Sequence, residues 1–150
     1  MGQPGVTASA VIGLAEKLEA SSSNFYKKLA EISPENKDLF LAFAKDGQKN
    51  KVLIIRTYQE TISDALEACF CFKGIDLKTH ETEMTFDEEA SYSEALKKAI
   101  KLEGKAVRFY SEIAEASEKL LATIPKTLRK VAESRNARRL KLESLLQNLK

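Results

Sequence analysis

Apolar side chains recur at helical spacing in four segments of this 150-residue chain. Residues three, four and seven positions apart share one face of an α-helix, so each segment predicts a helix with one buried stripe. The four stripes are Val11, Ala15, Leu18, Phe25, Leu29 and Ile32; then Phe40, Phe43, Ala44, Leu53, Ile54 and Tyr58; then Leu96, Ala99, Leu102, Ala106, Phe109 and Ile113; and finally Leu128, Val131, Leu142 and Leu145.

Capping residues mark where these helices begin and end. Thr7 is a suitable N-cap for the first, and Ser33 followed by Pro34 closes it and opens the second. The third begins near Ser91 or Ser93, and the fourth begins at the 123–125 boundary, which contains a proline, and runs toward Lys150. Residues 62–90 are apolar at first and acidic afterwards, so we expect a long, mostly solvated crossover.

The chain also repeats itself. Shifting residues 15–33 by 84 positions onto 99–117 gives nine identical residues of nineteen, and the second and fourth segments align more weakly at an offset of 88. Two copies of one helical hairpin predict an all-α fold. We expect one domain over residues 1–150, an antiparallel four-helix bundle with its long crossover between helices 2 and 3.

Composition narrows the class of protein. The chain is 43% hydrophobic and 31% charged, with only six Gly and three Pro, which disfavours disorder and turn-rich β folds. No segment approaches the roughly 18 apolar residues of a membrane span, so no membrane association is expected. Cys69 and Cys71 do not form a disulfide framework, and we interpret them as buried apolar side chains of a cytoplasmic protein. His80 is the one histidine.

The net charge of +2 is unevenly distributed. Residues 125–150 carry eight Lys and Arg against two Glu, a balance of +6, so the rest of the chain sums to −4. A nucleic-acid surface would interleave aromatic side chains with this charge, and the segment has none. We therefore do not expect nucleic-acid binding, and expect the inward-facing arginines to meet carboxylates instead.

Polar residues interrupt the stripes at corresponding places. The first helix sets Glu19 two turns before Tyr26, and the third repeats this with Glu103 and Tyr110. The fourth stripe is broken by Arg135 and Arg138, and the second surrounds Gly47 and Asn50. Two inward carboxylates need compensating charge, which the two arginines supply. The sequence thus predicts a buried polar cluster at mid-bundle, formed by Glu19, Tyr26, Glu103, Tyr110, Arg135 and Arg138.

Glu19 with Phe25-Tyr26, and Glu103 with Phe109-Tyr110, resemble the first and third helices of the ferritin-like superfamily, closest to its rubrerythrin-like branch. The resemblance covers nearly the whole chain. It implies a di-iron centre with a Glu from each of these helices and a Glu-x-x-His motif from each of the other two. Those motif positions align with Gly47 and Asn50, and with Arg135 and Arg138, so all four ligands are lost and only the Glu19 and Glu103 positions remain.

We accordingly expect a degenerate di-iron site without metal or other cofactor, in which protein cations replace metal cations. The function predicted is a non-catalytic bundle with a binding or self-association role, forming a homodimer; a further protein partner is not identified. The natural interface is 65–75, with Leu66, Phe70 and Phe72 as its large side chains; an equal alternative is that these side chains cap one end of the core. The alternative is a rubrerythrin-like oxidoreductase that binds iron through unconventional ligands such as Glu19, Glu103, Asp46 and Glu133. No nucleophile–base pair, phosphate loop or dinucleotide fingerprint suggests another enzyme.

Overall fold

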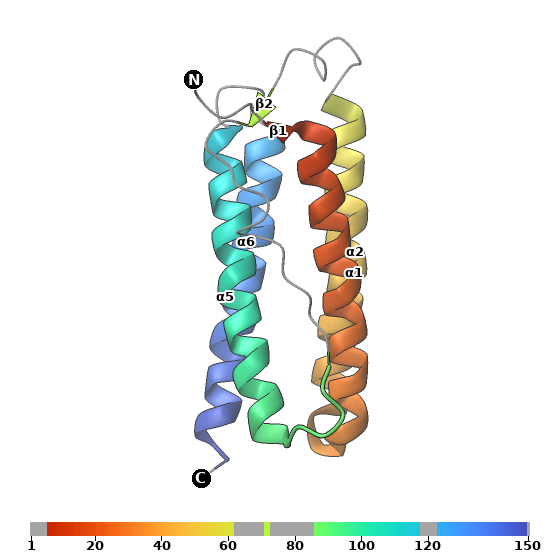
Figure 1. The fold of residues 1–150 in the computed structure, drawn as a ribbon, viewed down its shortest axis with the longest axis vertical. Coiled ribbons are helices and arrows are strands. Elements are labelled where there is room, and N and C mark those ends of the chain that lie inside the picture. The colour runs from red at the N-terminus through yellow and green to blue at the C-terminus, as the bar shows by residue number, and fades with distance from the viewer. Residues whose placement is uncertain (1–5, 62–70, 73–85, 118–122, 150) are drawn as a thin grey trace.

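The computed structural model describes residues 6–61, 71–72, 86–117 and 123–149, and its helices lie side by side along one long axis (Figure 1). In chain order the long helices are α1 (Ala8–Ile32), α2 (Lys37–Thr61), α5 (Tyr92–Ala116) and α6 (Thr123–Gln147), each of 25 residues. The predicted all-α class with four helices is therefore confirmed for the described part of the chain. None of these helices is long and apolar enough to cross a membrane.

Two of the helix starts use the caps that the sequence predicts. The Thr7 hydroxyl accepts a hydrogen bond from the backbone N–H of Ala10, and the Ser91 hydroxyl accepts one from Glu94. Each satisfies one of the donors that the first turn of a helix leaves without an intrahelical partner. The turn after Ser33 differs from the prediction, because Pro34 begins a short 3₁₀ helix, η1 (Pro34–Asn36), before α2 starts.

The helices pack as two hairpins. α1 lies against α2 and α5 against α6, while contacts of α2 with α6 and of α1 with α5 join the two pairs. In Figure 1 α2 finishes at the end of the bundle where α1 begins, and α5 begins at the opposite end. The chain between Thr61 and Tyr92 therefore connects two helices that run in the same direction.

Two short antiparallel strands pair at one end of the bundle (Figure 1). β1 (Val6–Thr7) pairs with β2 (Cys71–Phe72), so the backbone just before α1 is joined to the backbone of the crossover. The sequence pattern did not predict it, because two residues are too few to show a strand period. Cys69, His80 and most of the predicted 65–75 interface fall outside the described residues, so the predictions for this part of the crossover are not tested.

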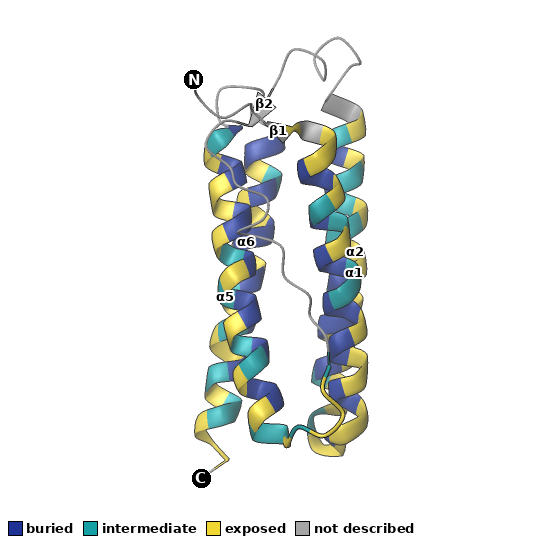
Figure 2. Ribbon diagram, viewed as in Figure 1, coloured by how far each residue is buried: buried dark blue, intermediate teal, exposed yellow. Residues whose placement is uncertain are grey.

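Buried faces of the four helices point inward along the whole bundle (Figure 2). They form two apolar clusters, one around Val11, Leu18, Phe109 and Ile113, the other around Phe25, Leu29, Phe40 and Leu96. The stripe predicted for α1 is wrong only at Ile32, which is 41% exposed because the helix ends there beside the turn to η1. On α1, α5 and α6 the buried residues between the two clusters are polar.

Candidate functional site

A layer of four buried charges separates the two apolar clusters. Glu19 comes from α1, Glu103 from α5, and Arg135 and Arg138 from α6. The two carboxylates and Arg135 have no solvent exposure, and Arg138 has 3%. Removing each ion from water costs several kcal/mol, so the cluster persists only if the charges and hydrogen bonds compensate one another. The two negative and two positive charges sum to zero.

Arg135 bridges the two carboxylates. Its Nη2 lies 2.5 Å from Oε1 of Glu19, and its Nη1 donates to both oxygens of Glu103 at 2.9 and 2.8 Å. The same Nη1 also donates to the hydroxyl of Ser22 at 2.8 Å. The planar guanidinium is thus held by residues of α1 and α5 at once, and ties α6 to both helices.

Arg138 binds Glu103 from the next turn of α6. Its Nη1 donates to Oε2 of Glu103 at 3.3 Å, and its guanidinium carbon lies 5.3 Å from the ring centre of Tyr26 and 5.0 Å from that of Phe43. These cation–π contacts add favourable electrostatic interactions to a cation that has left water. Three nitrogen atoms of the layer, Arg135 Nε, Arg135 Nη2 and Arg138 Nη2, have no hydrogen-bond partner among the described residues, although Arg135 Nη2 forms the ion pair with Glu19.

Each tyrosine of the sequence repeat donates to the glutamate of the other repeat. Tyr26 on α1 donates to Glu103 at 2.6 Å, and Tyr110 on α5 donates to Glu19 at 2.6 Å. Burial, followed by the adjacent carboxylate, raises the pKa of both phenols well above the ordinary value of 10.0. Both tyrosines are therefore neutral donors at physiological pH, which is the form a carboxylate requires.

The charge on Arg135 is secured by its partners. Burial alone would lower the pKa of this guanidinium, but the negative charges of Glu103 and Glu19 raise it well above its ordinary value. A cation that cannot lose its proton therefore occupies the centre of the bundle at any pH at which the protein is folded.

Helix α2 contributes no charged side chain to the layer. It contributes Gly47 and Asn50, the two positions that align with lost metal ligands of the ferritin-like family. Asn50 donates to Oε1 of Glu19 at 3.4 Å. A Cβ atom at Gly47 would lie 3.2 Å from the backbone oxygen of Glu19 and 3.5 Å from the Cβ of Ser23. Gly47 is thus a close-packing position between α1 and α2, where a longer side chain would force the helices apart.

The structure brings all six residues of the predicted polar cluster together. Sequence reasoning missed Ser22, which accepts from Arg135, and Ser23, which donates to the carbonyl of Ala44 at 2.9 Å. The available signal was position, because Ser22 lies three residues after Glu19 and four before Tyr26, on the same face.

These groups do not fit a pair of divalent metal ions. A carboxylate-bridged di-iron site needs about six protein ligands, and this layer holds two carboxylates already occupied by guanidinium and phenol donors. A unit cation about 4 Å from a guanidinium is opposed by roughly 4 kcal/mol at an effective dielectric constant of about 20, and a divalent ion by more.

The alternative ligands do not complete such a site. Glu133 is exposed and lines a hollow on the outer side of α5 and α6, together with Ser111 and Ala132. Across the described ranges, no three His, Cys, Asp or Glu residues gather so that they could hold a metal ion. Asp46, only partly buried, forms no such group with Glu19 and Glu103.

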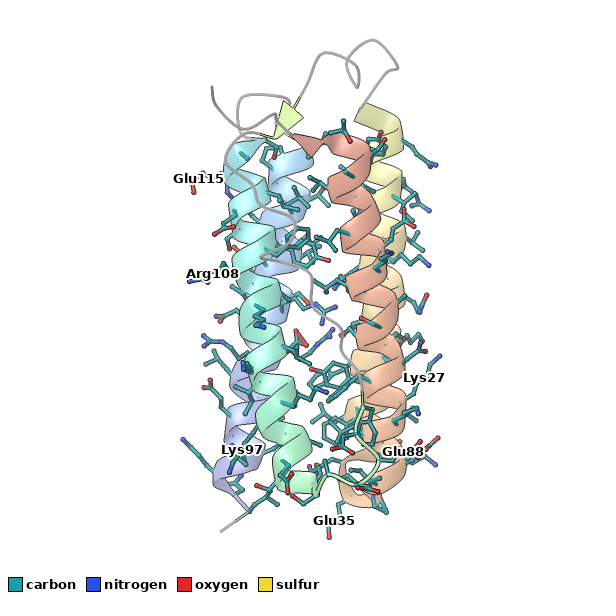
Figure 3. The ribbon with its side chains drawn as sticks, viewed as in Figure 1. Lys27, Glu35, Glu88, Lys97, Arg108 and Glu115 are labelled. Atoms are coloured by element: carbon teal, nitrogen blue, oxygen red, sulfur yellow. The ribbon has the colours of Figure 1, made fainter. Side chains whose placement is uncertain are left out.

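The buried arginines also alter the picture of the basic fourth helix. Two of the eight basic residues in 125–150, Arg135 and Arg138, pair with carboxylates of the buried layer. Arg139 lies 3.7 Å from Glu143. On other helices, the labelled side chains of Lys27 (α1) and Arg108 (α5) point away from the bundle (Figure 3). The inward arginines meet carboxylates, as the charge pattern predicts.

Comparisons of the chain with protein-family models, with curated protein sequences and with solved structures give no match.

Proposed function

We propose that this chain is a non-catalytic ferritin-like bundle, related most closely to the rubrerythrin-like branch, in which a Glu/Arg cluster replaces a di-iron centre. The two-hairpin arrangement, the crossover joining two helices of the same direction, and the duplicated Glu and Tyr positions support the relationship. The absence of His at the aligned positions of α2 and α6 separates the chain from a metal-binding member.

The observation that carries the proposal is the place of Arg135. Its guanidinium contacts Glu19 and Glu103 together, the two residues that align with metal ligands of the family. One protein cation thus neutralises both carboxylates, and Arg138 supplies the second positive charge. The bundle keeps its shape by internal ion pairs and needs no metal ion to fold.

We propose that the bundle, with ion pairs filling its centre, has a binding role in the form of self-association. The homodimer and a cytoplasmic location belong to this proposal. The long rigid helices offer outward faces whose spacing is fixed by the buried layer, which is the property an assembly module requires.

The test is the metal content of protein expressed in iron-rich medium, measured by elemental analysis. We expect far less than one iron per chain, and no rise in melting temperature when Fe(II), Mn(II) or Zn(II) is added, because a ligand bound only by the folded state would raise it. The matched control is the variant Glu103→Gln. Iron that remains in this variant lies on the surface and leaves the proposal intact.

About two irons per chain in the natural protein, lost in the Glu103→Gln variant, would overturn the proposal. That result would place the metal in the buried layer and favour the rubrerythrin-like oxidoreductase.

A further inference from the structure

The outer side of the α5–α6 hairpin carries a groove. Two hollows of about 440 and 360 Å³ adjoin there and share Ser111, Ala132 and Glu133 in their walls. The second hollow extends along the helices to Val107, Ala137 and Leu140, so its walls are mostly apolar, with Glu133 and Asn136 at its polar margin. Small side chains line much of this groove, which allows another helix to approach closely.

Leu140 stands at the rim of this groove. It is 53% exposed, the highest value among the large hydrophobic side chains that the structure describes as exposed. Leu140 lines this hollow in its own chain and is exposed enough to contact the hollow of a second copy. An apolar side chain beside an apolar hollow on one surface is the arrangement that a self-complementary interface requires.

The charges beside the groove also suit a self-complementary interface. Glu133, Ala137 and Lys141 are all exposed and follow one another at intervals of four, so they form a row along the outer face of α6. Glu133 and Lys141 lie about 6 Å before and after Ala137 along the helix axis, since each residue advances the helix by about 1.5 Å. When two such rows meet antiparallel at Ala137, Glu133 of each copy lies opposite Lys141 of the other.

We infer that the groove on the outer side of α5 and α6 binds a second copy of this chain about a two-fold axis near Ala137. Leu140 of each copy enters the groove of the other between Val107 and Ala132, and two Glu133–Lys141 pairs flank the axis. The inference rests on the proposed self-association and names its surface, which differs from the 65–75 segment that the sequence suggests.

Charge reversal tests the interface without touching the core. Sedimentation equilibrium of the 150-residue chain at low salt is expected to give a dimer. The single variants Glu133→Lys and Lys141→Glu each turn both flanking pairs into repulsive ones, and should weaken the dimer at least about tenfold. The double variant E133K/K141E restores opposite charges across the axis, so dimerisation should return to within about threefold of the natural protein.

Leu140→Glu should also abolish the dimer, and Val52→Glu on α2 is its matched control, because Val52 is exposed to 52% and lies on another helix. Circular dichroism verifies that all variants remain helical. A monomeric natural protein overturns the inference, as does a dimer that survives Leu140→Glu, that is lost in Val52→Glu, or that the double variant does not restore. Metal content is independent of all these outcomes, so the metal-free centre stands or fails separately.

Discussion

The phenol of Tyr26 donates a 2.6 Å hydrogen bond to Glu103, a residue 77 positions later on another helix. Its counterpart Tyr110 does the same for Glu19. The repeated sequence segments thus exchange their hydrogen bonds, and each tyrosine fixes the carboxylate that an arginine of α6 contacts. This exchange joins α1 to α5, two helices that belong to different hairpins.

The exchanged bonds predict matching effects of two substitutions. Tyr26→Phe and Tyr110→Phe each remove a donor to a buried charged acceptor, and each should lower the free energy of unfolding by about 1.5–3 kcal/mol. Urea denaturation followed by circular dichroism measures the loss. The control is Tyr92→Phe, which removes only a part-buried bond from Asn36 and should cost about 1 kcal/mol or less. Equal losses in Tyr26→Phe and Tyr92→Phe would contradict the buried bond.

Removing one charge of the layer should be far more costly than removing a surface charge. Glu103→Ala leaves Arg135 and Arg138 with one carboxylate between them, and should destabilise the fold by about 3 kcal/mol or more. Glu143→Ala breaks the half-exposed pair with Arg139 and should cost less than about 1 kcal/mol. Thermal and chemical unfolding of both variants distinguish the cases. An unchanged melting temperature in Glu103→Ala would mean that the layer is solvated.

Two glycines on neighbouring helices should respond in opposite directions to alanine. Gly47→Ala places a methyl group 3.2 Å from the backbone oxygen of Glu19, and should cost about 1–3 kcal/mol because backbone cannot move aside as a side chain can. Gly13→Ala meets no atom within 4 Å and should stabilise α1 by up to about 1 kcal/mol through helix propensity. Unfolding curves give both signs. Stabilisation by Gly47→Ala would refute close packing at that position.

Stability should decline in alkaline solution. The pKa of Tyr26 and that of Tyr110 are raised in the folded state, so above about pH 10 the unfolded chain releases these protons while the folded chain keeps them. The free energy of unfolding should therefore fall with pH, by up to about 1.4 kcal/mol per pH unit for each tyrosine. Below pH 10 neither phenol contributes to the pH dependence. Denaturation between pH 8 and pH 11 measures the slope.

The double variant Y26F/Y110F should lose most of this alkaline slope, because its remaining tyrosines lie outside the layer. The absorbance of tyrosinate provides a second measure, since Tyr26 and Tyr110 should ionise only when the chain unfolds. If the slope persists unchanged in the double variant, other groups cause the alkaline sensitivity.

The four helices could be predicted because each has apolar residues at helical spacing and boundaries with a physical cause. Thr7, Ser91 and the prolines at 34 and 125 mark helix ends through local hydrogen bonding and fixed backbone geometry. The pairing of β1 with β2 could not be predicted, because its two partners are 64 and more residues apart and too short to show a pattern.

The residues of the charged layer could also be predicted from the sequence. Buried carboxylates need compensating cations, and α6 has two arginines on its inward face. Which cation pairs with which carboxylate depends on how the four helices are offset from one another along the bundle axis. This offset places Arg135 between both glutamates and leaves Arg138 with Glu103 and two aromatic rings. It also places Gly47 against the backbone of Glu19, a role that spacing within one helix cannot reveal.

The sequence by itself determined the helical class, the duplication and the identity of the buried charges, because periodicity and charge balance are local or additive properties of a chain. Only the tertiary structure decided that the tyrosines exchange partners between repeats, that one guanidinium serves two carboxylates, and that Leu140 stands beside a groove. These depend on distances between helices that touch only after folding, where displacements of about 1 Å decide whether a hydrogen bond forms.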